Sequence, residues 1–186
     1  MKPIRLFLTL FLSLFLLAAC GAQGTGNAQN DWKVYHAKAA SLVNPNFPAY
    51  SLEYPSAWAK QEEANHIMFA SDAKLLKVTP QKLELGQIIA GLSMNVNRTP
   101  EEMIDTYAST LKGTIQFEDA VSVIVNGHPA AYQKGKNSET GDETFVIATD
   151  IGENTGGLLT ARIAAGEADK WKEILFRIAQ SLQLEG

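Results

Sequence analysis

The fold of this chain is decided by the stretch IIAGLSMNVNRTPEE, residues 88–102. Its first nine residues place an apolar side chain at every second position, which is the period of a β-strand, and their number favours a long central strand. Thr99 then offers an N-cap, Pro100 suits the first helical position, and Glu102 completes a capping box. The stretch therefore predicts a long strand that leads directly into a helix.

The predicted helix continues to Gly113, the residue expected to end it. One of its faces is apolar and carries Met103, Ile104, Tyr107, Ala108 and Leu111. Its acidic residues Glu101, Glu102 and Asp105 are interpreted as capping and helix-dipole residues on a solvated face, in preference to a metal site. The apolar face predicts that this helix packs on a sheet.

Further strands are predicted on both sides of this stretch. Upstream, short apolar or alternating runs occupy residues 50–54, 67–70 and 75–78. Downstream, β-rich runs occupy residues 117–125, 130–133, 144–151 and 158–164. They are joined by an Asn-Gly hairpin turn at 126–127, a polar connection over 135–143 and a turn over 152–157. Residues 116–164 therefore predict an antiparallel meander.

The chain closes with a predicted amphipathic helix over residues 167–182. Its apolar face carries Trp171, Ile174, Leu175, Ile178 and Leu182. Such a helix is expected to cover one face of the sheet. A strand-rich segment, a helix, four strands and a closing helix together predict an α+β fold, in which a central, mainly antiparallel sheet is flanked by helices as an α/β/α sandwich.

The first twenty residues have the layout of a bacterial lipoprotein leader. Lys2 and Arg5 precede an apolar run, as in a secretory signal. The run ends in Leu-Ala-Ala-Cys, residues 17–20, which resembles the lipobox. We therefore predict a lipoprotein signal peptide over residues 1–19 and acylation of Cys20. An ordinary secretory signal with a cysteine at its cleavage site is the alternative.

Cys20 is the only cysteine in the chain, so no intramolecular disulfide, Cys-based zinc site or iron–sulfur cluster can form. Acylation with more than one fatty chain would hold the protein stably on a membrane. The uncharged, glycine-containing residues 20–30 predict a flexible tether behind the lipidated cysteine, and residues 31–186 predict a single domain.

The charge balance argues against a nucleic-acid partner. The formal net charge is −4, and removal of Lys2 and Arg5 with the leader makes it −6. A nucleic-acid-binding protein needs a basic surface that neutralises phosphates. The expected partners are therefore membrane lipid, through Cys20, and another protein.

No motif for catalysis or for a cofactor stands out. The segment GLSMN, residues 91–95, lacks the last glycine of a nucleophile elbow and falls within a predicted strand. Neither a P-loop nor a dinucleotide fingerprint occurs. The histidines His36, His66 and His128 lack helical metal spacing, and His128 beside the hairpin turn is the one best placed to reach a partner. The sequence thus predicts no catalytic residue, no metal site and no cofactor, and the protein is expected not to be an enzyme.

An acidic cluster in the connection over 135–143 leaves two interpretations. Glu139, Asp142 and Glu143 are oxygen ligands of the kind that Ca²⁺ takes from loops, but their spacing matches no EF-hand. A solvated acidic loop is therefore favoured over a weak calcium site.

Tryptophans mark the expected packing. Trp171 is predicted to face the core, with Trp58 packed under it. Trp32 either caps the domain or lies near the lipid interface, where tryptophan is favoured, and capping is the preferred interpretation.

Three segments of the chain resemble motifs of one known family. YSLEYPSAW, residues 50–58, is similar to the family's opening strand with its Tyr-Pro-x-x-Trp motif. VNGHPAAY, residues 125–132, resembles the family's Asn-Gly-x-x-Ala hairpin. Trp171, with Ile-x-x-Ser-Leu at 178–182, resembles its last helix. The resemblance covers residues 47–184.

The family that these segments resemble is the PsbP-like family, and the resemblance implies both a fold and a mode of action. PsbP-like proteins and the related Ran-release factors use a central antiparallel sheet flanked by helices to bind other proteins, and they are not known as enzymes. Their best-known members are extrinsic subunits of photosystem II, but this chain has no segment that matches the photosystem-docking N-terminal region of PsbP.

The expected function is therefore that of an extracytoplasmic lipoprotein of the cell envelope, anchored to a membrane by Cys20. It would act as a non-catalytic module that binds or helps to assemble an envelope or photosynthetic-membrane protein. A carrier of a small ligand or metal ion is one alternative, a photosystem-associated extrinsic protein is another, and a hydrolase is the weakest.

Overall fold

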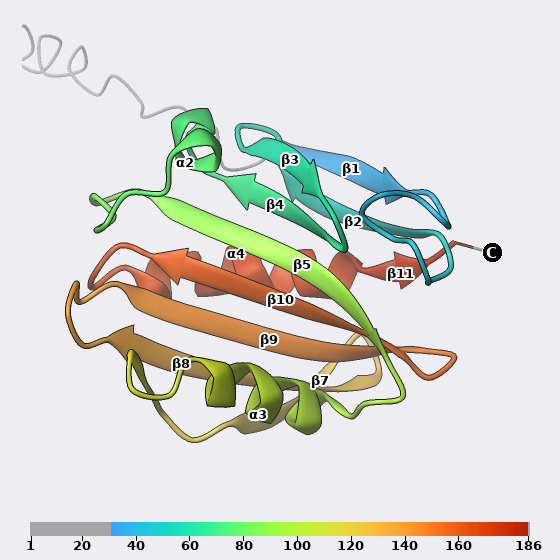
Figure 1. Ribbon diagram of the computed structural model, residues 1–186. Helices are drawn as coiled ribbons and strands as arrows, with labels where there is room; N and C mark the ends of the chain where they lie inside the picture. The colour runs from blue at the N-terminus through green and yellow to red at the C-terminus, as the bar shows by residue number, and fades with distance from the viewer. Residues whose placement is uncertain (1–30, 186) are drawn as a thin grey trace, which may run out of the picture. The chain divides into compact units, whose positions relative to one another are not determined.

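The structure is a computed structural model that describes residues 31–185 (Figure 1). The strands are β1 (Trp32–Ala37), β2 (Tyr50–Pro55), β3 (Ala59–Glu63), β4 (His66–Ala70), β5 (Ile88–Val96), β6 (Ile115–Phe117), β7 (Val121–Val125), β8 (His128–Asn137), β9 (Glu143–Gly152), β10 (Thr155–Ile163) and β11 (Gln183–Leu184). The helices are α2 (Ala73–Lys77), α3 (Pro100–Thr110) and α4 (Ala168–Ser181).

Eight strands form the main sheet. Seven follow the order β3-β4-β5-β10-β9-β8-β6, and β7 also pairs with β8. All of its strand pairs are antiparallel. β5 pairs with β10 along its whole length, from Ile88 opposite Ile163 to Val96 opposite Thr155. The alternating stretch at 88–96 is therefore an inner strand of the sheet, as predicted.

A smaller sheet of three strands has the order β1-β2-β11. Trp32 lies opposite Pro55 at one end of the β1–β2 pair, and Ala37 lies opposite Tyr50 at the other. Trp32 is partly buried against the core, and the guanidinium of Arg177 in α4 lies 4.0 Å from its ring centroid. Trp32 therefore packs on the domain, as the capping interpretation predicted.

The two faces of the main sheet are covered by different layers. One face packs against α4 and the small sheet, and this core includes Phe69, Leu92, Ile147, Leu159, Tyr50, Leu52, Trp171 and Leu175. On the opposite face, α3 buries Met103 and Ile104 against Ala131, Val146 and Ala148. Figure 1 shows α3 in front of the sheet and α4 behind it. The α+β fold with helices on both sides of an antiparallel sheet is thus as predicted.

Local signals place both long helices where the sequence predicts them. The Thr99 hydroxyl accepts the Glu102 N–H, and the Glu102 carboxylate accepts the Thr99 N–H, which completes the capping box of α3. Trp171 on α4 is buried, and its ring meets that of Trp58 edge to face at a centroid distance of 5.8 Å. The predicted pairing of these two tryptophans is therefore confirmed.

Several local predictions need correction. Residues 75–78 are not a strand, because Asp72 caps the short helix α2 by accepting the Lys74 N–H. The run at 117–125 is broken into β6 and β7. The connection predicted over 135–143 is shorter, since β8 reaches Asn137 and β9 begins at Glu143. β3 was not predicted because none of its side chains is buried. None of the described helices is long and apolar enough to cross a membrane.

Candidate functional site

The predicted lipidation residue, Cys20, lies outside the described residues. The same holds for the predicted signal peptide over 1–19 and for the tether over 20–30. Acylation of Cys20 therefore stays a prediction.

The three histidines lie on three different strands. On β1, the Nδ1 atom of His36 lies 2.5 Å from the Glu185 carboxylate. On β4, the Nε2 atom of His66 lies 3.1 Å from the Glu63 carboxylate. His128 is exposed and begins β8. Across residues 31–185, no group of three His, Cys, Asp or Glu side chains is placed to hold a metal ion.

The acidic cluster at 139–143 is neither a calcium site nor a solvated loop. Glu139 is exposed, whereas Asp142 is only 1% exposed. The Glu143 carboxylate accepts the N–H of Ala168 at 2.8 Å, at the start of α4. The three carboxylates thus do not converge on one point. Both sequence interpretations of this cluster are therefore wrong for Asp142, whose buried charge requires a partner.

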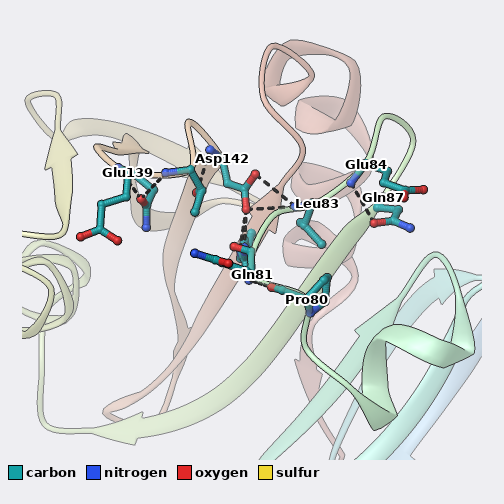
Figure 2. Close-up of polar contacts among 10 residues, drawn as sticks. Pro80, Gln81, Leu83, Glu84, Gln87, Glu139 and Asp142 are labelled. Atoms are coloured by element: carbon teal, nitrogen blue, oxygen red, sulfur yellow. Dashed lines mark hydrogen bonds and ion pairs between the residues drawn. The ribbon is translucent and has the colours of Figure 1, made fainter.

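That partner is Arg162 on β10. Its Nε atom donates to the Asp142 carboxylate at 2.7 Å, and its two terminal nitrogens donate to the carbonyls of Pro80 and Gln81 at 2.9 and 2.5 Å. The Leu83 N–H also donates to Asp142, at 3.3 Å (Figure 2). We call this arrangement the Asp142–Arg162 clamp. It fixes the backbone of residues 80–83, which belong to no strand or helix, to the ends of β9 and β10.

The two edges of the main sheet differ in character. At one edge lies β3, whose sequence AKQEE includes Lys60 and Glu62 in an ion pair at 3.1 Å. Charged side chains are a common device that prevents an edge strand from pairing with another chain. At the other edge, β6 and β7 lie along β8, and the sequence of β7 is VSVIV. This second edge lacks the protection that β3 has.

The strand β7 presents apolar side chains to solvent. Ile124 is 70% exposed and Val121 is also exposed, whereas Val125 is buried. The Ser122 hydroxyl donates to Glu101 at 2.8 Å and so ties β7 to the first turn of α3. The predicted alternation of Val121, Val123 and Val125 is present in β7, whose register with β8 is unbroken, but of these three side chains only Val125 is fully buried.

The strand β7 is paired with another strand on its inner side only. It pairs with β8 from Val121 opposite Tyr132 to Val125 opposite His128. Asn126 and Gly127 join the two strands with φ angles of 53° and 82°, which is the geometry of a tight hairpin turn. Within residues 31–185, no strand lies on the outer side of β7. An incoming strand would find unpaired backbone N–H and C=O groups there.

The hollows in the surface of the domain are modest in size. One of 340 Å³ lies over the sheet, between Tyr107 of α3 and the strands β4, β5 and β10. Burial raises the pKa of Tyr107, and a hydrogen bond with Thr160 partly offsets this. Pockets for small ligands have volumes of roughly 300 to 1,000 Å³, so this hollow is at the small end of that range.

The other shifted tyrosine pKa values belong to the core beneath the small sheet. Burial raises the pKa of Tyr50 to about 12, and the nearby negative charge of Glu62 acts in the same direction. The pKa of Tyr35 is also raised, first by burial and then by Glu62. These neutral phenols are packing residues of that core.

Sequence reasoning missed both Ile124 and Arg162, although each left a signal. Ile124 is out of phase with Val121, Val123 and Val125, so the face that carries Ser122 also carries a large apolar residue. Arg162 interrupts the alternating run at 158–164 with a charge. Such a charge inside a strand predicts a buried partner, but the partner itself comes from a distant segment.

Comparisons by sequence find no counterpart. No protein-family model matches the chain, and no curated protein matches it.

Solved structures do resemble it. Cyanobacterial PsbP from Synechocystis sp. PCC 6803 matches with a TM-score of 0.48 and 12% identity, over 91% of this chain and 99% of that one. LpqN, involved in cell envelope biogenesis of Mycobacterium tuberculosis, matches with a TM-score of 0.48 and 16% identity, over 89% and 100%. A protein of unknown function from Pseudomonas aeruginosa matches with a TM-score of 0.43 and 13% identity, over 84% and 99%.

A PsbP is thus among the structures that this chain resembles, as its sequence motifs predicted. The likeness concerns the arrangement of strands and helices.

Proposed function

We propose that this protein is an extracytoplasmic lipoprotein, anchored by an acylated Cys20, that binds another envelope or membrane protein through the edge strand β7. The proposal assigns it no catalytic role. The observation that supports it most is the contrast between the charged edge at β3 and the exposed apolar edge at β7.

The expected mode of binding is addition of a strand. A partner strand that pairs with β7 gains backbone hydrogen bonds along the edge, and its side chains at alternate positions contact the apolar residues of β7. Because all strand pairs of the main sheet are antiparallel, an antiparallel partner would continue the same pattern. Ile124 and Val121 would then leave water on binding, which adds a hydrophobic contribution.

The predicted anchor would help a weak contact of this kind. A tether of about ten residues spans on the order of 17 Å. Proteins held by a short linker meet at effective concentrations in the millimolar range. A five-residue strand pairing that is weak in solution would then be populated on the membrane.

Photo-crosslinking from the edge strand tests the proposal. A photoreactive amino acid at position 124 of the full-length chain is expected to capture a specific membrane or envelope protein in cells. The same residue placed at Gln61 on β3 is the control, because that edge is exposed but charged. Equal capture from both edges, or none from position 124, would contradict the role of β7.

Two variants complete the design. With the photoreactive amino acid moved to Val121, which is also exposed on β7, Ile124→Lys is expected to abolish capture without loss of stability, since the Ile124 side chain is largely exposed. Leu42→Lys is its matched control, because Leu42 is 66% exposed and its carbonyl accepts the N–H of Asn65 between β3 and β4, at the other edge of the main sheet. Cys20→Ala should release the protein from membranes and weaken capture. A Cys20→Ala protein that stays on membranes would sink the anchor prediction and leave the edge-strand prediction to be judged separately.

A further inference from the structure

A second exposed apolar surface lies on α2 and the loop that follows it. Val78 is 74% exposed and Leu85 is 79% exposed, the highest values among the large apolar side chains of residues 31–185. Lys74, Lys77 and Lys82 are exposed in the same segment. We call these five residues the α2 surface.

The lysines of the α2 surface have no acidic partner. None of the three forms an ion pair with any residue of the described range, whereas Lys134 and Lys170 pair with Asp169 and Glu167. The three lysines line one hollow of 390 Å³, together with Leu75, Val78, Pro80, Glu84 and Gln87. Three lysines that form no ion pair with the described residues therefore lie beside apolar side chains, with Glu84 as the one acid in the lining.

The loop holds this surface in place. Leu83 is buried, and the Asp142–Arg162 clamp binds the backbone on its N-terminal side. At the other end of the loop, the Gly86 N–H donates to the Glu167 carboxylate at 2.5 Å. Val78 and Leu85 are thus kept in solvent by a loop that is pinned at two points, although each would be more stable out of water.

The α2 surface lies at the end of the domain where the described chain begins. Trp32 pairs opposite Pro55, and the Asp31 carbonyl accepts the Ser56 N–H at 2.8 Å. The strand β3 begins three residues after Ser56, at Ala59. Ala59 pairs with Ala70, which ends β4 shortly before α2 begins at Ala73. Figure 1 shows the start of β1 and α2 on the same side of the molecule. The thirty residues that precede Asp31 include the predicted lipid anchor.

We infer that the α2 surface binds an anionic phospholipid bilayer directly. Lysines near such a surface are attracted by its negative potential, and apolar side chains beside them insert at the boundary between headgroups and acyl chains. The predicted anchor brings the same end of the domain to the membrane. This contact would orient the domain and leave β7, on a sheet edge remote from β3 and β4 in the strand order, free for a protein partner.

The net negative charge of the chain does not oppose this contact. The Debye length is about 8 Å at physiological ionic strength, so a headgroup responds to the charges nearest to it. Two acids lie in the same segment: Asp72, whose carboxylate caps α2, and Glu84. The lysines outnumber them, and the apolar residues contribute independently of charge.

Vesicle co-sedimentation tests this inference without the anchor. The mature chain, residues 20–186 with Cys20→Ala, is mixed with vesicles of phosphatidylcholine or of equal parts phosphatidylcholine and phosphatidylglycerol. Binding is expected only to the anionic vesicles and should weaken as salt is added. Reversal of the three lysines to glutamate should lower the partition coefficient at least about tenfold. Val78→Ser with Leu85→Ser should lower it about fivefold or more.

A matched triple variant controls for overall charge. Lys38, Lys112 and Lys136 are exposed and have no ion-pair partner in the described range, and their reversal to glutamate changes the net charge equally. This control should retain binding. The inference is overturned if both triple variants lose binding equally, or if anionic vesicles bind no more than neutral ones. It is also overturned if the α2 surface variants lose a crosslinked protein but keep vesicle binding. Ile124→Lys should leave vesicle binding unchanged, so failure here and failure of the β7 proposal are distinguishable.

Discussion

Removal of Arg162 should destabilise the protein more than neutralisation of Asp142. Arg162→Met leaves a carboxylate that is 1% exposed with only the two 3.3 Å contacts from the Leu83 N–H. Breaking a buried ion pair in this way costs about 3 to 5 kcal/mol. Asp142→Asn leaves the arginine charge, but that side chain is 29% exposed, so water can solvate it. The expected cost is then about 1 to 3 kcal/mol.

The double variant gives the sharper test. In the Arg162→Met background, Asp142→Asn replaces an unpaired buried carboxylate with a neutral amide, which is far cheaper to bury. The same substitution that destabilises the natural protein should therefore stabilise the Arg162→Met variant. Such a change of sign reflects direct coupling between two residues in contact.

Urea unfolding followed by tryptophan fluorescence measures the free energy of unfolding of the natural protein, the two single variants and the double variant. Fluorescence is a suitable signal because Trp58 and Trp171 report on the core. The slope of the unfolding free energy against urea should be the same for each, so that midpoints compare directly. If Asp142→Asn destabilises both backgrounds by the same amount, the two residues are not coupled and the clamp is not a stabilising unit.

Two further predictions concern α4. Trp171→Ala should lower the free energy of unfolding by about 3 to 5 kcal/mol, because it removes a buried ring that packs on Trp58, and a calorimetric loss below about 1 kcal/mol would contradict this packing. Although desolvation alone raises the pKa of Glu167, hydrogen bonds from Lys170 and the Gly86 N–H bring it below its ordinary value of 4.5. Glu167 should thus stabilise the fold above pH 4.5 and lose this effect as pH falls through its lowered pKa. If the free energy of unfolding of a Glu167→Gln variant stays below that of the natural protein by the same amount from pH 7 to pH 3, the argument is refuted.

The sequence by itself determined the elements whose signals are local. The alternation at 88–96, the capping box of Thr99 and Glu102, and the Asn126-Gly127 turn each depend on residues within one strand or one helical turn. The apolar stripe of α4 is a signal of the same kind. These features therefore appear in the structure where the sequence places them.

Weak local signals were misread where two structures compete for a short apolar run. Residues 75–78 look like a strand by hydrophobicity alone, yet Asp72 is an N-cap and the residues after it favour a helix. The sequence of β3 shows no apolar alternation, so it did not predict a strand. Its exposed and half-buried residues form a strand because their backbone pairs with β4.

Only the tertiary structure decided which surfaces are covered. Whether Val121 and Ile124 are buried depends on what lies beside β7, and within residues 31–185 no strand does. Asp142 is buried because Arg162, twenty residues later, and the backbone near Leu83, about sixty residues earlier, converge on it. Burial and charge pairing are set by contacts between distant segments, and the periodicity of a single segment carries no information about which segment will become its neighbour.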